Sequence, residues 1–138
     1  MTHKNASILV VDDDADLRRA VSMRLALAGY AVQQAESGEA ALAVCAAHAP
    51  DVVVLDVNLP GISGFSVCAE LRGAVDRPGL SVVFLTGAAR NAVDQSVARR
   101  SDHAGGDYFL AKPHDSELLL QLVDEITSAT ALSSGSDS

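Results

Sequence analysis

Residues 8–14 read Ile-Leu-Val-Val-Asp-Asp-Asp, an unbroken apolar run that ends in three carboxylates. The same arrangement recurs at residues 52–56 (Val-Val-Val-Leu-Asp) and, with a hydroxyl in place of the carboxylate, at residues 82–86 (Val-Val-Phe-Leu-Thr). Apolar runs without polar alternation are typical of strands that are buried on both faces of a sheet. These three segments therefore predict central parallel strands, each of which brings a polar residue to its carboxyl end.

Segments with helical periodicity separate the strand-like runs. Leu17, Val21 and Leu25 fall on one face of a first helix, and Gly29 is placed to end it. Further helices are expected from a cap at Ser37 to about residue 49, over 64–71, over about 89–100, and from 115 or 116 onward. With weaker strands at 31–34 and 108–110, five strand–helix pairs alternate. This order predicts an α/β fold, a doubly wound five-stranded parallel sheet flanked by five helices.

The composition excludes several classes of protein. The chain has 138 residues, about half of them apolar, enough for one folded domain with its own core. A formal net charge of -8 would repel a phosphate backbone, so this domain is not expected to bind nucleic acid directly. No apolar run approaches the ~20 residues that cross a bilayer, and the first residues are not expected to form a signal peptide.

The two cysteines, Cys45 and Cys68, fit neither a metal-site spacing nor a disulfide framework, and both are expected in the core of a cytoplasmic protein. Residues 1–130 are predicted to form the domain. Residues 131–138 are predicted to form a Ser/Gly-rich tail that is frayed or begins a linker.

Residues suited to phosphoryl chemistry follow the predicted strands. Asp12 and Asp13 follow the first, Asp56 ends the third, Thr86 ends the fourth and Lys112 follows the fifth, and functional groups in such sheets gather at these carboxyl ends. Two carboxylates about 4 Å apart repel by ~4 kcal/mol at a surface-like dielectric, and this repulsion must be offset by a cation, by protonation or by distance. Hard oxygen ligands suit Mg²⁺, and a lysine ammonium and a threonine hydroxyl suit a phosphoryl oxygen. One of the carboxylates is a candidate nucleophile that would form an acyl phosphate.

Four motifs, in order along the chain, resemble the receiver domain of two-component response regulators. They are residues 10–14 (Val-Val-Asp-Asp-Asp), 55–64 (Leu-Asp-Val-Asn-Leu-Pro-Gly-Ile-Ser-Gly), 85–87 (Leu-Thr-Gly) and 112–113 (Lys-Pro). The resemblance covers about residues 6–130 and implies the CheY-like, flavodoxin-like strand order 2-1-3-4-5. It also implies that Asp56 is the phosphoacceptor. Asp13 and Asp56 would bind Mg²⁺ directly, together with the backbone carbonyl of Asn58, while Asp12 would hold a metal-bound water.

The resemblance assigns a second set of residues to the switch. Lys112 would contact the phosphoryl group, Thr86 would swing toward it, and Phe109 would be the switch aromatic residue on the face formed by the fourth helix, the fifth strand and the fifth helix. The peptide bond before Pro113 would be cis. The segment between Thr86 and Lys112 is longer than is usual in the family, which leaves the shape of this face open.

The leading hypothesis is therefore a signalling switch that accepts a phosphoryl group from a sensor histidine kinase or a phosphotransfer protein. It would catalyse only its own phosphorylation and dephosphorylation. One alternative is a Mg²⁺-dependent phosphohydrolase, for which Asp12-Asp13-Asp14 offers a haloacid-dehalogenase-like Asp-x-Asp motif with Asp12 as nucleophile. Another is a degenerate receiver that acts as a phosphorylation-independent interaction module.

The output of the switch is not readable from the sequence. A start at Met1 and a short tail favour a single-domain regulator, and the alternative is a receiver excised from a larger regulator such as a transcription factor. The downstream protein target stays unknown, and dimerisation through the fourth and fifth helices is left open.

Overall fold

The computed structural model describes residues 6–74, 80–86, 98–99, 107–111 and 116–135. The elements in chain order are β1 (Ser7–Val11), α1 (Ala15–Leu27), β2 (Ala31–Ala35), α2 (Gly38–Ala47), β3 (Val52–Asp56), α3 (Gly64–Ala74), β4 (Ser81–Thr86), β5 (Ala98–Arg99), β6 (Asp107–Ala111) and α4 (Ser116–Gly135).

The strands form one sheet in the order β2-β1-β3-β4-β6-β5. The pairs β1–β2, β1–β3, β3–β4 and β4–β6 are all parallel, and β6 takes the place of the expected fifth strand. The predicted α/β fold with a parallel sheet is therefore confirmed. Because the crossover from β2 to β3 passes over β1, the first strand lies inside the sheet, and its carboxyl end adjoins that of β3.

The structure departs from the prediction at Ala98 and Arg99. These residues belong to the helix expected over about 89–100, but they form a short strand that runs antiparallel to β6, with Ala98 opposite Phe109 and Arg99 opposite Tyr108. Pairing with Ala98 and Arg99 gives backbone groups on the outer edge of β6 hydrogen-bond partners within the sheet. The free energy gained from this pairing exceeds the weak helix preference of a segment whose apolar face is sparse. The rest of the expected helix, residues 87–97 and Arg100, lies outside the described residues.

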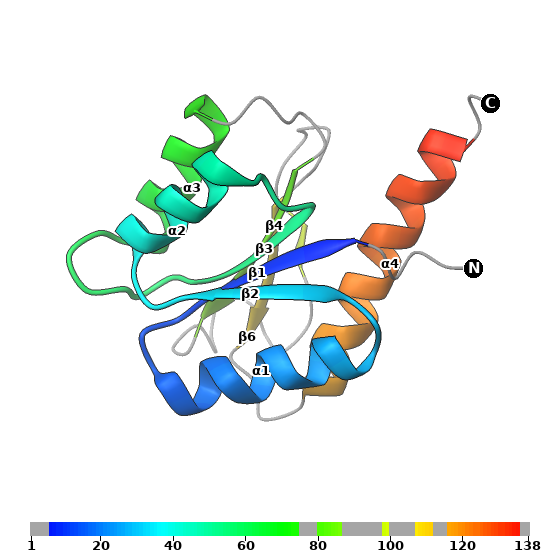
Figure 1. Ribbon diagram of the computed structural model, residues 1–138, viewed down its shortest axis with the longest axis horizontal. Helices are drawn as coiled ribbons and strands as arrows, with labels where there is room; N and C mark the ends of the chain where they lie inside the picture. Colours follow the sequence, from blue (N-terminus) through cyan, green and yellow to red (C-terminus); the bar gives the residue numbers. More distant parts are fainter. Residues whose placement is uncertain (1–5, 75–79, 87–97, 100–106, 112–115, 136–138) are drawn as a thin grey trace.

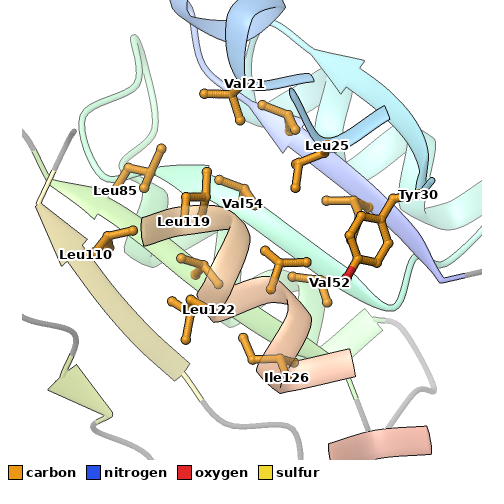
Figure 2. Packing of buried hydrophobic residues seen from close by; sticks show 14 residues of the cluster. Val21, Leu25, Tyr30, Val52, Val54, Leu85, Leu110, Leu119, Leu122 and Ile126 are labelled. Atoms are coloured by element: carbon orange, nitrogen blue, oxygen red, sulfur yellow. The ribbon is translucent and has the colours of Figure 1, made fainter. Parts of the chain in front are cut away.

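Alternate residues of the central strands belong to two separate clusters of buried side chains. Figure 1 shows helices on both sides of the sheet. On one side α2 and α3 lie next to each other, and the side chains of Leu9, Val53 and Phe84 are buried there. On the other side lie α1 and α4. The buried side chains on this side form the second cluster, in which Figure 2 shows Leu119 and Leu122 of α4 directed toward the strands. A sheet covered on both faces explains why its strands lack polar alternation.

Local capping decides where the helices begin. The Asp14 side chain accepts hydrogen bonds from the backbone N–H groups of Asp16 (3.1 Å) and Leu17 (3.2 Å) at the start of α1. The Ser37 hydroxyl accepts one from the N–H of Ala40 (3.1 Å), as predicted for α2. Gly29, with a φ of 106°, follows the end of α1 in the left-handed region that favours glycine.

The last helix is longer than the composition suggests. α4 continues through Gly135, so its backbone stays helical for five residues inside the segment 131–138 that was expected to fray or begin a linker. Once a helix is nucleated, each added residue needs little further free energy, and Ala131 and Leu132 have good helix propensity. The domain division at residue 130 remains a prediction.

Two contacts join α4 to α1 and to the start of β2. The Arg24 guanidinium of α1 forms an ion pair with Glu117 in the first turn of α4. The buried Tyr30 hydroxyl donates to the Asp124 carboxylate and lies 3.2 Å from the Thr127 hydroxyl oxygen. Burial, followed by the bond to Asp124, raises the pKa of Tyr30 to about 12.

Both cysteines are free and buried, as the sequence predicts, and burial raises the pKa of the Cys45 thiol. Among the described residues, no helix is long and apolar enough to span a membrane.

Candidate functional site

The carboxyl ends of β1 and β3 bring three aspartates together. Val11 pairs with Leu55 in the parallel register, so the residues that follow, Asp12 and Asp56, leave neighbouring strands at the same edge of the sheet. Ligand oxygens of Asp12, Asp13 and Asp56 all lie within 4.8 Å of one another. The convergence that the sequence predicts for these three residues is therefore present.

The three carboxylates differ in their access to solvent. Asp12 is 1% exposed and Asp56 is 3% exposed, whereas Asp13 faces solvent. Two buried carboxylates side by side are costly because each has lost hydration while repelling the other. A cation that enters from the side of Asp13 would offset this repulsion.

Backbone groups of the following turns orient the two buried carboxylates. The N–H of Asp14 donates to Oδ1 of Asp12 (2.9 Å), and the N–H of Asn58 donates to Oδ1 of Asp56 (3.1 Å). Each bond spans two residues and closes an Asx turn, a local structure that Asp readily forms at a strand end. The carboxylates of Asp12 and Asp56 thus contribute oxygens to the acidic cluster and also fix the turns that follow β1 and β3.

The loop from β3 to α3 forms one wall of the site. The N–H of Val57 donates to the carbonyl of Leu85 in β4 (3.0 Å), and the N–H of Gly64 donates to the carbonyl of Val57 (2.8 Å). These bonds fold residues 57–63 against Asp13 around an open pocket of about 410 Å³. The turn includes Gly61, whose φ of 84° suits glycine.

Gly64 also approaches the backbone of Asp56 closely. A Cβ atom at Gly64 would lie 2.4 Å from the carbonyl oxygen of Asp56 and 2.9 Å from the Cα of Val57. A residue with a side chain at this position would displace the end of β3. The motif in the sequence includes Gly64, but its role appears only when the loop is folded.

The donor set fits a hard divalent cation. Carboxylate oxygens from Asp12, Asp13 and Asp56 are the ligand type that Mg²⁺ prefers, and the exposed side of the cluster leaves room for water and a phosphate oxygen. Asn58 is exposed and lines the pocket, but coordination by its carbonyl remains a prediction.

The remaining predicted site residues are described only in part. Thr86 ends β4 and pairs with Ala111, which directly precedes Lys112 in the chain. Phe109 lies in β6 opposite Phe84. The side chains of Thr86 and Phe109, and all of Lys112 and Pro113, lie outside the described residues. Their contacts with a phosphoryl group, and the cis peptide bond, remain predictions.

One further residue at the site was not anticipated from the sequence. Arg18 of α1 donates from Nη1 to the backbone carbonyl of Asp12 (2.9 Å). Helical periodicity places Arg18 away from the core face of α1, but it does not say that the guanidinium reaches back to the end of β1.

A doubly wound parallel sheet with an acidic cluster where its central strands end defines a receiver-like α/β domain. The chain matches the response regulator receiver domain family over residues 8–124, and it belongs to that family. The resemblance inferred from the four motifs is thereby confirmed.

Similar proteins carry names that agree with this family. The chain is 40% identical over 132 residues to the probable transcriptional regulatory protein TcrX of Mycobacterium tuberculosis, covering 94% of this chain and 54% of that protein. It is 40% identical over 131 residues to the response regulator MprA of a Mycobacterium species, covering 95% and 54%. The chain thus spans about half the length of the curated relatives it matches.

Solved structures show the same fold. The response regulator TrrA of Thermotoga maritima, in complex with Mg²⁺ and BeF, superposes with a TM-score of 0.70 at 28% identity, over 88% of this chain and 98% of that one. The chemotaxis response regulator CheY4 of Vibrio cholerae superposes with a TM-score of 0.73 at 29% identity, again over 88% and 98%.

Proposed function

We propose that this domain is a phosphorylation switch in a two-component system. Asp56 accepts a phosphoryl group from a phosphohistidine of a sensor histidine kinase or a phosphotransfer protein, in a reaction that depends on Mg²⁺. The observation that carries this proposal is the grouping of the Asp12, Asp13 and Asp56 carboxylates within 4.8 Å, at the strand ends of a chain in the receiver family.

The chemistry assigns different tasks to the three aspartates. A carboxylate oxygen of Asp56 attacks phosphorus, the P–N bond of the donor breaks, and the imidazole leaves with the electron pair and takes up a proton. The N–H of Asn58 on Oδ1 orients the Asp56 carboxylate for this attack. Asp13, Asp56 and the Asn58 carbonyl would hold the cation directly, and Asp12 would hold a metal-bound water. The cation would offset negative charge on the carboxylates and on the phosphoryl oxygens.

The switch residues act after the transfer. We assign Lys112 and Thr86 to the phosphoryl oxygens, Phe109 to the conformational change, and a cis bond to Pro113, as the family resemblance implies. The parallel pairing of Thr86 with Ala111 supports the assignment, because it brings the ends of β4 and β6 to one level. The product of the reaction is a changed surface around β6 and α4 rather than a released metabolite, so the domain is not an enzyme toward other substrates.

The setting of the switch follows from its class. We place it in the cytoplasm, in contact with a kinase or phosphotransfer protein. The relative TcrX is named a probable transcriptional regulatory protein and is about twice as long as the matched region. A longer regulator that carries this domain is therefore one proposed context. The acidic domain itself is not expected to contact nucleic acid.

The test uses acetyl phosphate as a small phosphodonor, Mg²⁺, and intact-mass measurement. The wild-type protein should gain the mass of one phosphoryl group, and chelation of Mg²⁺ should abolish the gain. Asp56→Asn should remove the adduct, whereas Asp16→Asn, an exposed carboxylate on α1 outside the cluster, should leave it unchanged. An adduct that persists in Asp56→Asn would refute the assignment.

The same protein samples discriminate the alternatives. A phosphohydrolase would turn over a generic phosphomonoester and lose that activity in Asp12→Asn but not in Asp56→Asn. A phosphorylation-independent module would form no adduct in any of these proteins.

A further inference from the structure

Arg18 connects three elements at the edge of the acidic site. Its Nη1 donates to the backbone carbonyl of Asp12 (2.9 Å), and its Nε donates to the side-chain Oε1 of Gln34 on β2 (3.1 Å). The backbone N–H of Arg18 donates to the carbonyl of Asp14 (2.9 Å) at the start of α1. The Arg18 side chain and its bond to the Asp12 carbonyl are partly buried, so water screens that bond only in part, whereas the bond to Gln34 is exposed.

The carbonyl that Arg18 contacts has a special place in the site. It belongs to the peptide group that joins Asp12 to Asp13, so its direction determines how the chain leaves β1 and where the Asp13 side chain starts. The N–H of Asp12 is already held by the carbonyl of Ala35 (3.2 Å). Because Arg18 donates to the Asp12 carbonyl, both the N–H and the C=O of Asp12 have hydrogen-bond partners.

A guanidinium is well suited to this task. It is planar and always charged, and its N–H groups point in fixed directions, so bonding to Gln34 through Nε also aims Nη1 at Asp12. A hydrogen bond from a charged donor to a carbonyl is stronger than one between neutral groups. A lysine at this position would keep the charge but lose the two-pronged geometry.

Positioning and charge have opposite effects on cation binding. The positive charge of Arg18 repels an incoming cation, so removing the charge alone would tighten binding. The fixed Asp12–Asp13 peptide holds the ligands ready before the cation arrives, so removing the contact would weaken binding. The sign of the change in Mg²⁺ affinity therefore distinguishes the two roles.

We propose that Arg18 is a positioning residue for the acidic site, and that it holds the Asp12–Asp13 peptide group in the orientation that binds Mg²⁺. The inference rests on the proposed function and names one more residue on which that function depends. Groups that hold metal-binding residues in place typically contribute about 10-fold to 100-fold in metal affinity. Because Arg18 acts through one peptide group, the expected loss is at the lower end, about 10-fold.

The experiment measures the Mg²⁺ dissociation constant by calorimetric titration of the full chain. Arg18→Lys, which keeps the charge and loses the contact, should weaken binding about 10-fold. Arg18→Gln should weaken it by a smaller factor, because loss of the charge partly offsets loss of the contact. Arg19→Gln is the matched control, because Arg19 is the next residue of α1, carries the same charge and is exposed. It should leave the dissociation constant nearly unchanged.

Other outcomes would overturn the inference. If Arg18→Lys bound Mg²⁺ as tightly as the wild-type protein, or more tightly, Arg18 would act only through its charge or only in folding. Thermal unfolding without Mg²⁺ identifies a purely structural role, in which the melting temperature falls while the dissociation constant stays the same. If the Arg18 variants do not fold, Gln34→Leu removes the acceptor that aims the guanidinium. It should weaken Mg²⁺ binding by a smaller factor, and an unchanged affinity would refute the proposal.

The failure of the proposed function would look different. If the wild-type protein itself bound no Mg²⁺ and formed no adduct, the assignment of the site would fail, and the role of Arg18 would fail with it. A wild-type protein that binds Mg²⁺ while all Arg18 variants bind it equally well would overturn only the present inference.

Discussion

Gly64 is the position at which a single methyl group should disturb the site most directly. In Gly64→Ala the new Cβ would meet the Asp56 carbonyl oxygen at 2.4 Å, whereas carbon and carbonyl oxygen normally approach no closer than about 3.3 Å. Relief of this contact requires a shift of about 0.9 Å in the backbone of β3 or of the loop that follows. Overpacking of this kind costs about 1–3 kcal/mol, and a clash with backbone rather than with a flexible side chain falls in the upper half of that range.

The assay compares Gly64→Ala with Gly73→Ala, the same substitution in the same helix. No other described part of the chain comes within 4 Å of a Cβ at Gly73, so that variant should be neutral or up to about 1 kcal/mol more stable, as expected for alanine in a helix. Gly64→Ala should lose about 2–3 kcal/mol in the free energy of unfolding by urea titration. It should also slow adduct formation from acetyl phosphate, because the shift moves Asp56.

Two results would refute this reasoning. If both glycine variants were equally stable, the close approach at Gly64 would not constrain the loop. If Gly64→Ala were destabilised but formed the adduct at the wild-type rate, the loop would contribute to folding without positioning Asp56.

Three further predictions concern α4 and its contacts. The raised pKa of Tyr30 means that the folded protein keeps the phenol protonated while the unfolded chain loses the proton above pH 10, so wild-type stability should fall between pH 10 and about 12. Urea titrations should show a smaller fall in Tyr30→Phe, and parallel curves would contradict the prediction. Glu117→Gln breaks the partly exposed ion pair with Arg24 and should cost under about 1 kcal/mol, less in high salt; a larger, salt-independent loss would argue against an exposed pair. Leu119→Ala removes a fully buried side chain of α4 and should lower the free energy of unfolding by about 2–5 kcal/mol in thermal or urea titration. A loss below about 1 kcal/mol would contradict this packing.

Much of the site was predictable because its residues lie beside strong local patterns. The apolar runs at 8–11 and 52–55 predict buried strands, and residues that follow buried parallel strands gather at one edge. Asp12, Asp13 and Asp56 were placed together by this rule, and the structure brings their oxygens within 4.8 Å. The helix cap at Ser37 and the helix end at Gly29 were also predictable, because each depends on only a few neighbouring residues.

Prediction failed where a segment depends on distant partners. Ala98 and Arg99 fit a helical pattern, but they pair with β6, a strand that lies next to them only in the folded sheet. The extension of α4 to Gly135 was also missed, since composition describes the preference of a free segment rather than that of a segment continuing an existing helix.

The sequence by itself determined the class of the fold, the strands that carry the aspartates and the family to which the chain belongs. These depend on periodicity, on turn chemistry and on motifs that are local in the chain. Only the tertiary structure decided that the Arg18 guanidinium reaches the Asp12 carbonyl, that Gly64 lies against the Asp56 backbone, and that Tyr30 bonds to α4 across more than ninety residues. Such contacts depend on how packed helices and strands lie relative to one another. A pattern along one segment carries no information about which residues of another segment it will contact.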